Sequence, residues 1–271
     1  MNDHQTTPTV GGLLMAMWGR LRAEAQVALL LIALIVLAQY LLFRDLAGSL
    51  SQIMAAGGMQ DPEAIREQVL PLLRPLVVRN LIIGLVWLLA VTVWAHVLTH
   101  GRPLAAGRMA VTFLHILWRS VAMVGWGVLL GIPLAAFYLL LMGLFAVVGV
   151  KLSAMQINVL LGGLAVVFYV PLFATYLLAV VETAAHGRTP IHQAFDALGR
   201  GRTPYFLASF LLTIAGAVLS GLVTVVLGEG MAFSVTGMVV SAAINGIWLM
   251  ASLALAAAVH PFTYFASGLE L

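Results

Sequence analysis

Residues 120–150 read SVAMVGWGVLLGIPLAAFYLLLMGLFAVVGV, a run of 31 residues without Asp, Glu, Lys or Arg. Five more uncharged runs of 19, 22, 30, 26 and 40 residues lie at 25–43, 80–101, 152–181, 203–228 and 230–269. A membrane-spanning helix needs about 20 mostly apolar residues, because each residue advances about 1.5 Å through a hydrocarbon layer about 30 Å thick. The sequence therefore predicts an all-α, polytopic bundle of six transmembrane helices. The expected spans are 26–43, 77–97, 121–148, 157–181, 205–227 and 235–259.

The composition supports a membrane protein independently of these runs. Hydrophobic residues make up 62% of the 271 residues, and charged residues make up 8%, against about 25% in a soluble domain. This length suits one transmembrane domain over 1–271, without an added soluble domain. The absence of cysteine excludes disulfides, iron–sulfur ligation and thiol nucleophiles. Basic residues are scattered singly or in pairs, so nucleic-acid binding is not predicted, and neither is a cofactor.

The distribution of basic residues predicts the orientation of the helices. With a cytoplasmic amino terminus, eight basic residues fall on the cytoplasmic side: Arg20, Arg22, Arg102, Arg108, Arg119, Arg188, Arg200 and Arg202. Five fall on the outer side: Arg44, Arg66, Arg74, Arg79 and Lys151. Cytoplasmic loops of membrane proteins carry an excess of Lys and Arg, so we expect both termini in the cytoplasm.

The longest expected outer segment is 44–75, between the first two spans. It contains a Gly57-Gly58 break and then Asp61-Pro62-Glu63, a pattern typical of a helix start with proline in the first turn. We expect a short helix there, on the membrane surface or capping the bundle. Pro71 and Pro75 are expected to end it, because proline lacks a backbone donor and disfavours helix in the preceding residue.

Similar segments recur at the expected cytoplasmic ends of the spans and divide the chain into three units, 1–98, 99–184 and 185–271. The recurring segments are Gly19-Arg20-Leu21-Arg22, Gly199-Arg200-Gly201-Arg202, His100-Gly101-Arg102-Pro103, His186-Gly187-Arg188-Thr189-Pro190 and His260-Pro261. Each unit is expected to be an interfacial amphipathic helix followed by a transmembrane hairpin. In such a helix, apolar residues enter the acyl boundary and arginines face lipid phosphates.

One segment carries a family resemblance. It reads Thr189-Pro190-Ile191-His192-Gln193-Ala194-Phe195-Asp196-Ala197-Leu198-Gly199-Arg200, and Tyr205-Phe206-Leu207 then enters the fifth span. With the three expected hairpins, the chain resembles the bacterial integral-membrane family named for the membrane domain of glycerophosphoryl diester phosphodiesterases. The resemblance covers nearly the whole chain and implies the six-helix fold and the bacterial inner (cytoplasmic) membrane. It does not imply phosphodiesterase activity, because those catalytic groups belong to a separate soluble barrel that this chain is too short and too apolar to contain.

A few ionisable residues near the ends of the spans are spaced as metal ligands can be. The five candidates are His96, His100, Glu182, His186 and His260. If the hairpins bring them together, imidazole and carboxylate groups suit a transition metal or a proton relay. The simpler interpretation, which we prefer from the sequence, is that the histidines are solvated among lipid headgroups and Glu182 pairs with an arginine such as Arg188. We therefore predict no catalytic residue.

Asn158 and Asn245 are the clearest polar side chains inside the expected spans. With Glu182, they are candidates to line a solute pathway. The other interpretation is that each amide makes an interhelical hydrogen bond that holds the bundle, because a buried amide must find a partner in lipid. The sequence favours this packing role.

Small residues and prolines inside the spans also have two interpretations. Small residues four apart, such as Gly127 and Gly131, favour close helix packing. Pro133 and Pro171 either kink their helices or interrupt them around a transport site, and the kink is the commoner case.

The sequence therefore predicts a non-enzymatic polytopic inner-membrane protein that acts as a membrane-embedded interaction or assembly component. Its expected partners are membrane lipids and either another protein or a second copy of the chain. The alternative is a transporter of a small or lipid-like solute. An intramembrane enzyme ranks third, because the histidine and glutamate residues lack a convincing nucleophile.

Overall fold

The computed structural model describes residues 8–55, 62–101, 106–148, 154–187, 191–227 and 234–263. In these ranges the regular structure is helical, and no strand occurs. The helices are α1 (Val10–Ala23), α2 (Ala25–Ala55), α3 (Pro62–His100), α4 (Ala106–Val148), α5 (Ala154–His186), α6 (Ile191–Ala197), η1 (Gly199–Gly201), α7 (Arg202–Leu227), α8 (Val235–Val259) and η3 (His260–Phe262). Six of them, α2, α3, α4, α5, α7 and α8, are long and apolar enough to cross a membrane, which confirms the predicted fold class.

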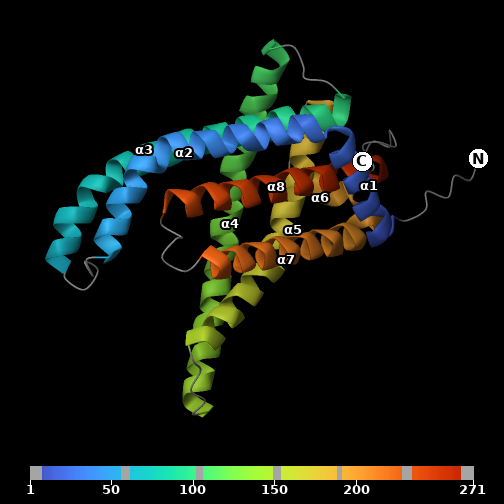
Figure 1. Ribbon diagram of the computed structural model, residues 1–271. Helices are drawn as coiled ribbons and strands as arrows, with labels where there is room; N and C mark the ends of the chain where they lie inside the picture. Colours follow the sequence, from blue (N-terminus) through green and yellow to red (C-terminus); the bar gives the residue numbers. More distant parts are fainter. Residues whose placement is uncertain are drawn as a thin grey trace, which may run out of the picture.

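The six long helices form three antiparallel hairpins that share one end. The hairpins are α2–α3, α4–α5 and α7–α8, and they meet where α1 and α6 lie (Figure 1). We call this the shared end of the bundle. Away from it, the α4–α5 hairpin runs across the direction of the other two (Figure 1). Helix α8 lies centrally and contacts α1, α2, α3, α5 and α7.

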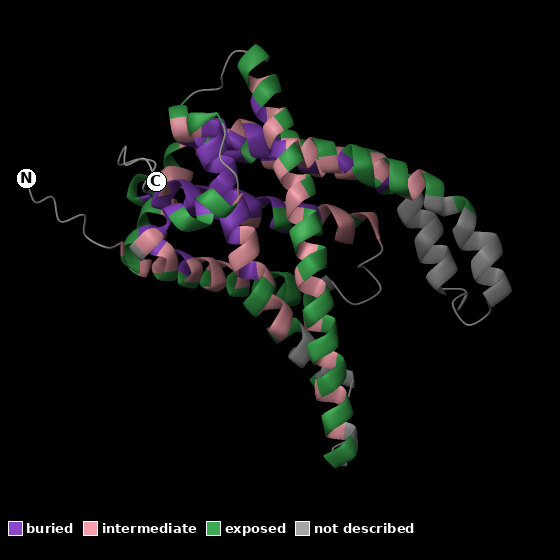
Figure 2. Ribbon diagram, turned by 180° about the vertical axis from the view of Figure 1, so that it is seen from behind, coloured by how far each residue is buried: buried purple, intermediate pink, exposed green. Residues whose placement is uncertain are grey.

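The buried core lies at the shared end (Figure 2). The last part of α8, from Leu249 to Val259, is buried throughout and packs against the last turns of α3 and α5. Lipid tails are as apolar as these side chains, so membrane helices associate through close packing and interhelical hydrogen bonds. Both occur here: α8 is rich in alanine, and the indole Nε1–H of Trp94 donates to the carbonyl of Met250 at 3.0 Å.

The expectation that Pro71 and Pro75 end a short outer helix is wrong. Helix α3 begins at Pro62, where the sequence predicted a helix start, and continues through both prolines to His100. Each proline removes one backbone donor, and membrane helices tolerate that loss. Residues 56–61, which include the Gly57-Gly58 break, lie outside the described ranges.

The three-unit repeat is not confirmed. Separate helices precede the first and third hairpins, as α1 and α6, whereas α4 is one continuous helix from Ala106 to Val148. The segment expected to lie in the interface before the third span is therefore continuous with the helix of that span.

Helix α1 packs onto α7 and α8 and buries Leu13 completely. Its Arg20 does not follow the expectation that arginines here face lipid phosphates, because Nη1 donates to the carbonyl of Leu98 at 3.0 Å. Leu98 lies in the last turn of α3, where carbonyls lack partners within the helix. Burial lowers the pKa of the Arg20 guanidinium from its ordinary value. Arg20 therefore joins the first helix to the end of the third.

The helices containing Pro133 and Pro171 are continuous, so neither proline interrupts its span. Gly127 and Gly131 of α4 allow close packing, as the sequence predicted. The hydroxyl of Tyr169 on α5 donates to the carbonyl of Gly127 at 3.0 Å, and a Cβ on Gly131 would lie 3.0 Å from the same hydroxyl oxygen. Even so, the most apolar 18-residue stretch of α4 contains no buried residue. Among the six candidate spans, α4 is therefore the one that the rest of the protein covers least.

Candidate functional site

Three of the five candidate ligands come together at the shared end. Glu182 and His186 lie four residues apart near the end of α5, a spacing that places both on one face of a helix. His260 comes from η3, directly after α8. One ligand atom from each of the three lies within 4.8 Å of the others. We call these three residues the Glu–His cluster.

Glu182 is the centre of this cluster. Its Oε1 lies 2.8 Å from Nδ1 of His260 and 3.1 Å from the Thr263 hydroxyl, whose single proton is shared between this oxygen and the His260 carbonyl at 2.8 Å. Its Oε2 lies 3.7 Å from Nε2 of His186 and is a buried atom without a hydrogen-bond partner. The Glu182 side chain is fully buried, whereas 46% of the His186 side chain is exposed. The cluster thus has an inner carboxylate and an outer, accessible imidazole.

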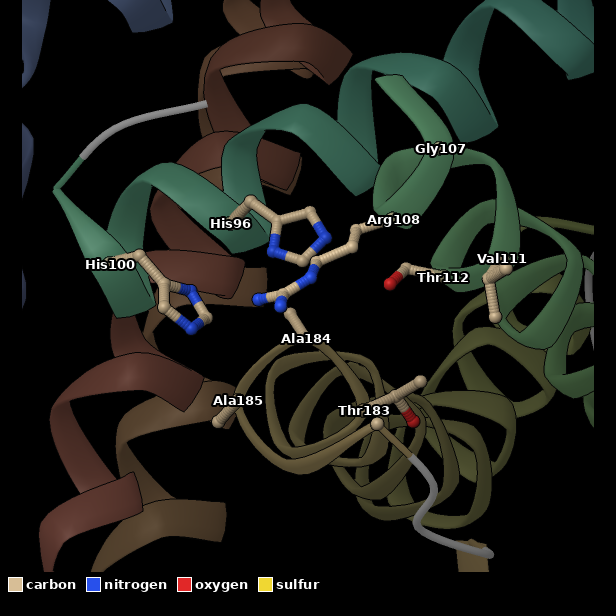
Figure 3. Close-up of a pocket in the computed structure, with 10 residues that line it drawn as sticks. His96, His100, Gly107, Arg108, Val111, Thr112, Thr183, Ala184 and Ala185 are labelled. Carbon is tan, nitrogen blue, oxygen red and sulfur yellow. The ribbon is translucent and has the colours of Figure 1, made fainter. Parts of the chain in front are cut away.

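The other two candidates line a cavity on α3. His96 and His100 face Arg108 and Thr112 of α4 and the end of α5, around a space of about 510 Å³. Figure 3 shows the guanidinium of Arg108 between the two imidazole rings. The ring centroids of His96 and His100 are 5.6 Å apart. We call this space the Arg–His cavity.

His96 corrects the expectation that these histidines are solvated. Its side chain is fully buried, and neither ring nitrogen has a hydrogen-bond partner. Buried polar groups normally have partners, so a buried imidazole that lines a cavity and has no hydrogen bond at either nitrogen indicates a place for a ligand or water. His100 is exposed, and its Nδ1 lies 2.7 Å from the Thr99 hydroxyl oxygen.

The groups around the Arg–His cavity favour an anion. Arg108 has a permanent positive charge, and the threonine hydroxyls and imidazoles are potential donors. The described lining residues include no carboxylate. Gly107 and Arg108 lie in the first turn of α4, where free backbone N–H groups and the helix dipole favour negative charge.

A second hollow lies between α3, α5 and α8, closer to the middle of the spans. It has a volume of about 290 Å³ and is largely apolar, and Trp87, Phe173 and Trp248 are among its lining residues. Asn245 also lines it, and its Nδ2 donates to Ser241 Oγ at 3.4 Å within α8. The hydrogen bond of the Asn245 side chain is thus within one helix, whereas the sequence favoured a hydrogen bond between helices.

The predicted candidates therefore divide into separate sets. His96 and His100 line the cavity, Glu182, His186 and His260 form the cluster, and Asn245 lines the apolar hollow. The side chain of Asn158 and all of Arg188 lie outside the described part of the chain. Sequence reasoning missed Arg108, Thr112 and Thr263. Arg108 was used only in the count of basic residues that predicted the orientation. Its position near the expected start of a helix was a signal that could have indicated an anion site.

Comparison with known proteins gives no further assignment. No family model, curated protein or solved structure matches the chain. The resemblance to the membrane-domain family of glycerophosphoryl diester phosphodiesterases therefore stays a prediction, and what this structure shows is a multi-span helical protein with six helices able to cross a membrane.

Proposed function

We propose that the protein is a non-enzymatic, multi-pass protein of the bacterial inner membrane that binds the phosphate of an anionic lipid headgroup in its Arg–His cavity. In this role it acts as a membrane-embedded interaction component. The observation that carries the proposal is the fully buried His96, with two unpartnered ring nitrogens, beside the guanidinium of Arg108 (Figure 3).

The chemistry of the cavity matches a phosphate group. A guanidinium binds phosphate oxygens through two parallel N–H···O hydrogen bonds. Such charge-assisted hydrogen bonds are shorter and stronger than hydrogen bonds between neutral groups. His96 of α3 and Thr112 of α4 both line the cavity and can add one donor each. A cavity of about 510 Å³ also exceeds the volume of a single phosphate, so part of a glycerol group fits with it.

The position of the cavity supports a lipid rather than a free anion as the ligand. His100 and His186 are the last residues of α3 and α5, so the cavity lies at the ends of two spans. The eight-to-five distribution of basic residues supports placing this end in the cytoplasm, together with both termini. The cavity would then be at the depth of the inner-leaflet headgroups.

The exposure of α4 supports an interaction role. Its most apolar window contains no buried residue, and its exposed side chains include Trp118 and Trp126. A span with so little protein around it is available to lipid and to a partner helix, either from another protein or from a second copy of this chain.

Lipid binding can be tested with the whole protein in nanodiscs. We would compare discs of phosphatidylcholine alone with discs that also contain phosphatidic acid, and count retained lipid by native mass spectrometry. Wild-type protein should retain phosphatidic acid, and Arg108→Gln should lose at least about tenfold in affinity, the value of one strong charge-assisted bond of about 1.5–3 kcal/mol. Arg22→Gln removes an exposed charge on the same side and should retain the lipid.

Two results would contradict the proposal. One is equal retention by Arg108→Gln and the wild type. The other is displacement of the lipid by millimolar inorganic phosphate, which would identify a free anion as the ligand.

The apolar hollow supports a second candidate function, transport of a lipid-like solute. Four aromatic side chains and one amide line it at the depth of the acyl chains. However, the packed section around Trp94 and Met250 separates it from the shared end, so transport requires rearrangement of the core. Proteoliposomes with a fluorescent lipid test this function. Movement between leaflets that falls in Asn245→Leu would support it, and movement equal to that of empty liposomes would exclude it.

A further inference from the structure

We infer that Glu182, His186 and His260 bind one first-row transition-metal ion, with Zn²⁺ as the representative ion, at the shared end of the bundle. Two imidazole nitrogens and one carboxylate oxygen are a ligand set known for zinc sites that keep one position open. The inference uses the Glu–His cluster alone, so it does not depend on the proposed lipid binding.

The distances in the cluster suit a shared ion. Bonds of 2.0–2.2 Å in tetrahedral geometry place two ligand atoms about 3.4 Å from each other. The observed separations lie on both sides of this value, at 2.8 Å from His260 Nδ1 to Glu182 Oε1 and 3.7 Å from His186 Nε2 to Glu182 Oε2. The two distances are to different oxygens of Glu182, and one ligand atom from each residue lies within 4.8 Å of the others, so side-chain adjustment would accompany ion binding.

A hydrogen bond between His260 and Glu182 without a metal ion leaves part of the arrangement of the cluster unexplained. Such a hydrogen bond satisfies Oε1, which also accepts a hydrogen bond from Thr263. It leaves Oε2 buried and without a partner, although a buried carboxylate oxygen normally has one. An ion between Oε2 and His186 Nε2 would satisfy this oxygen, and its binding would release the proton shared by His260 and Glu182.

The helix ends around the cluster favour a cation. His186 ends α5 and Val259 ends α8, so the partly negative carboxyl ends of two helices meet here. A buried carboxylate at such an end is unfavourable unless a positive charge accompanies it. Thr263, which would not bind the ion itself, orients the Glu182 carboxylate by a hydrogen bond to Oε1. Groups around metal ligands commonly have this role.

The ligand types indicate which metals fit. Two imidazoles suit Zn²⁺, Ni²⁺, Cu²⁺ or Fe²⁺, whereas Mg²⁺ and Ca²⁺ prefer oxygen ligands only. The exposed part of His186 gives the ion a path from water, and a water molecule would be the fourth ligand. The expected stoichiometry is one ion per chain.

The test uses the full chain in detergent, with a purification tag that contains no histidine. After treatment with a chelator, Zn²⁺ binding is titrated by calorimetry, and Co²⁺ is used as a spectroscopic probe of tetrahedral coordination. Wild-type protein should bind one ion with a visible Co²⁺ spectrum. Glu182→Gln, His186→Ala and His260→Ala should each weaken binding more than about tenfold, because even an outer partner of a ligand is worth 10–100-fold.

Two further variants make the result specific. His192→Ala removes an exposed histidine on α6 and should bind Zn²⁺ like the wild type. Thr263→Val should weaken binding and alter the Co²⁺ spectrum while all three ligands remain. If Glu182→Gln does not fold, His186→Ala decides the question, because His186 is the most exposed ligand. Wild-type binding of more than one ion, or unchanged binding by His186→Ala, would overturn the inference.

Discussion

The imidazole Nδ1 of His260 lies 2.8 Å from the carboxylate Oε1 of Glu182, although 78 residues separate them in the chain. This contact joins the end of α8 to the last turns of α5. It also places a fully buried carboxylate beside a partly buried imidazole, at the end of the bundle that contains the buried core.

His260→Ala should destabilise the metal-free protein by about 1–3 kcal/mol, because Glu182 would keep only Thr263 as a hydrogen-bond donor. The measurement is thermal or denaturant unfolding in detergent with a chelator present. His192→Ala is the control and should change the free energy of unfolding by less than about 0.5 kcal/mol. Equal stabilities for the two variants would argue against this role of His260.

Gly216→Ala should weaken the packing of α7 on α8. A Cβ at Gly216 would lie 2.9 Å from Cδ1 of Trp248, and that indole is stacked on Phe173 with ring centroids 5.1 Å apart. The added methyl group would displace this ring from its stack on Phe173, and we expect a cost of about 1–3 kcal/mol in unfolding measurements. Gly221→Ala, on the same helix, has no atom within 4 Å and should be neutral or slightly stabilising. A cost for both substitutions would point to helix α7 itself and not to this contact.

Trp94→Phe should reduce stability by about 1–3 kcal/mol, since it removes the hydrogen bond to the Met250 carbonyl and part of a fully buried ring. Trp18→Phe changes an indole that is 65% exposed and should have almost no effect. Unfolding midpoints of the two variants, measured in the same detergent, compare them directly. A smaller effect at Trp94 would contradict the packing described for α3 and α8.

The orientation can be tested by cysteine labelling, because the chain contains no cysteine of its own. With both termini in the cytoplasm, a membrane-impermeant maleimide should label Lys151→Cys in spheroplasts and should label Gln193→Cys only after lysis. The opposite pattern would place the shared end outside.

The six helices were predictable because hydrocarbon excludes charge, and this exclusion is visible in the sequence. Residues 120–148 of the neutral run lie in α4, and the Asp61-Pro62-Glu63 pattern indicated the start of α3 at Pro62. The path of α3 through Pro71 and Pro75 was not predictable. Local rules give the free-energy cost of a proline inside a helix, but they do not say whether the packing of the whole helix compensates for that cost.

The candidate site was predictable in its residue types but not in its grouping. The four-residue spacing of Glu182 and His186 indicated a shared face of α5, and the sequence could name His260 as a candidate. That His260 joins this pair, while His96 faces Arg108, depends on how the hairpins pack. The burial of His96 likewise follows from how the helices pack around α3, which no local pattern encodes.

The diverging hairpins give the molecule an unequal footprint in the bilayer. In the leaflet at the shared end, protein packs against protein, whereas further along the spans large side chains such as Leu81, Leu139 and Leu140 stay exposed. In a bilayer these exposed apolar side chains would contact acyl chains, so lipid would cover much of the distal half of this fold. Bilayer thickness and chain order should consequently influence the spread of the α2–α3 and α4–α5 hairpins more than the geometry of the Glu–His cluster.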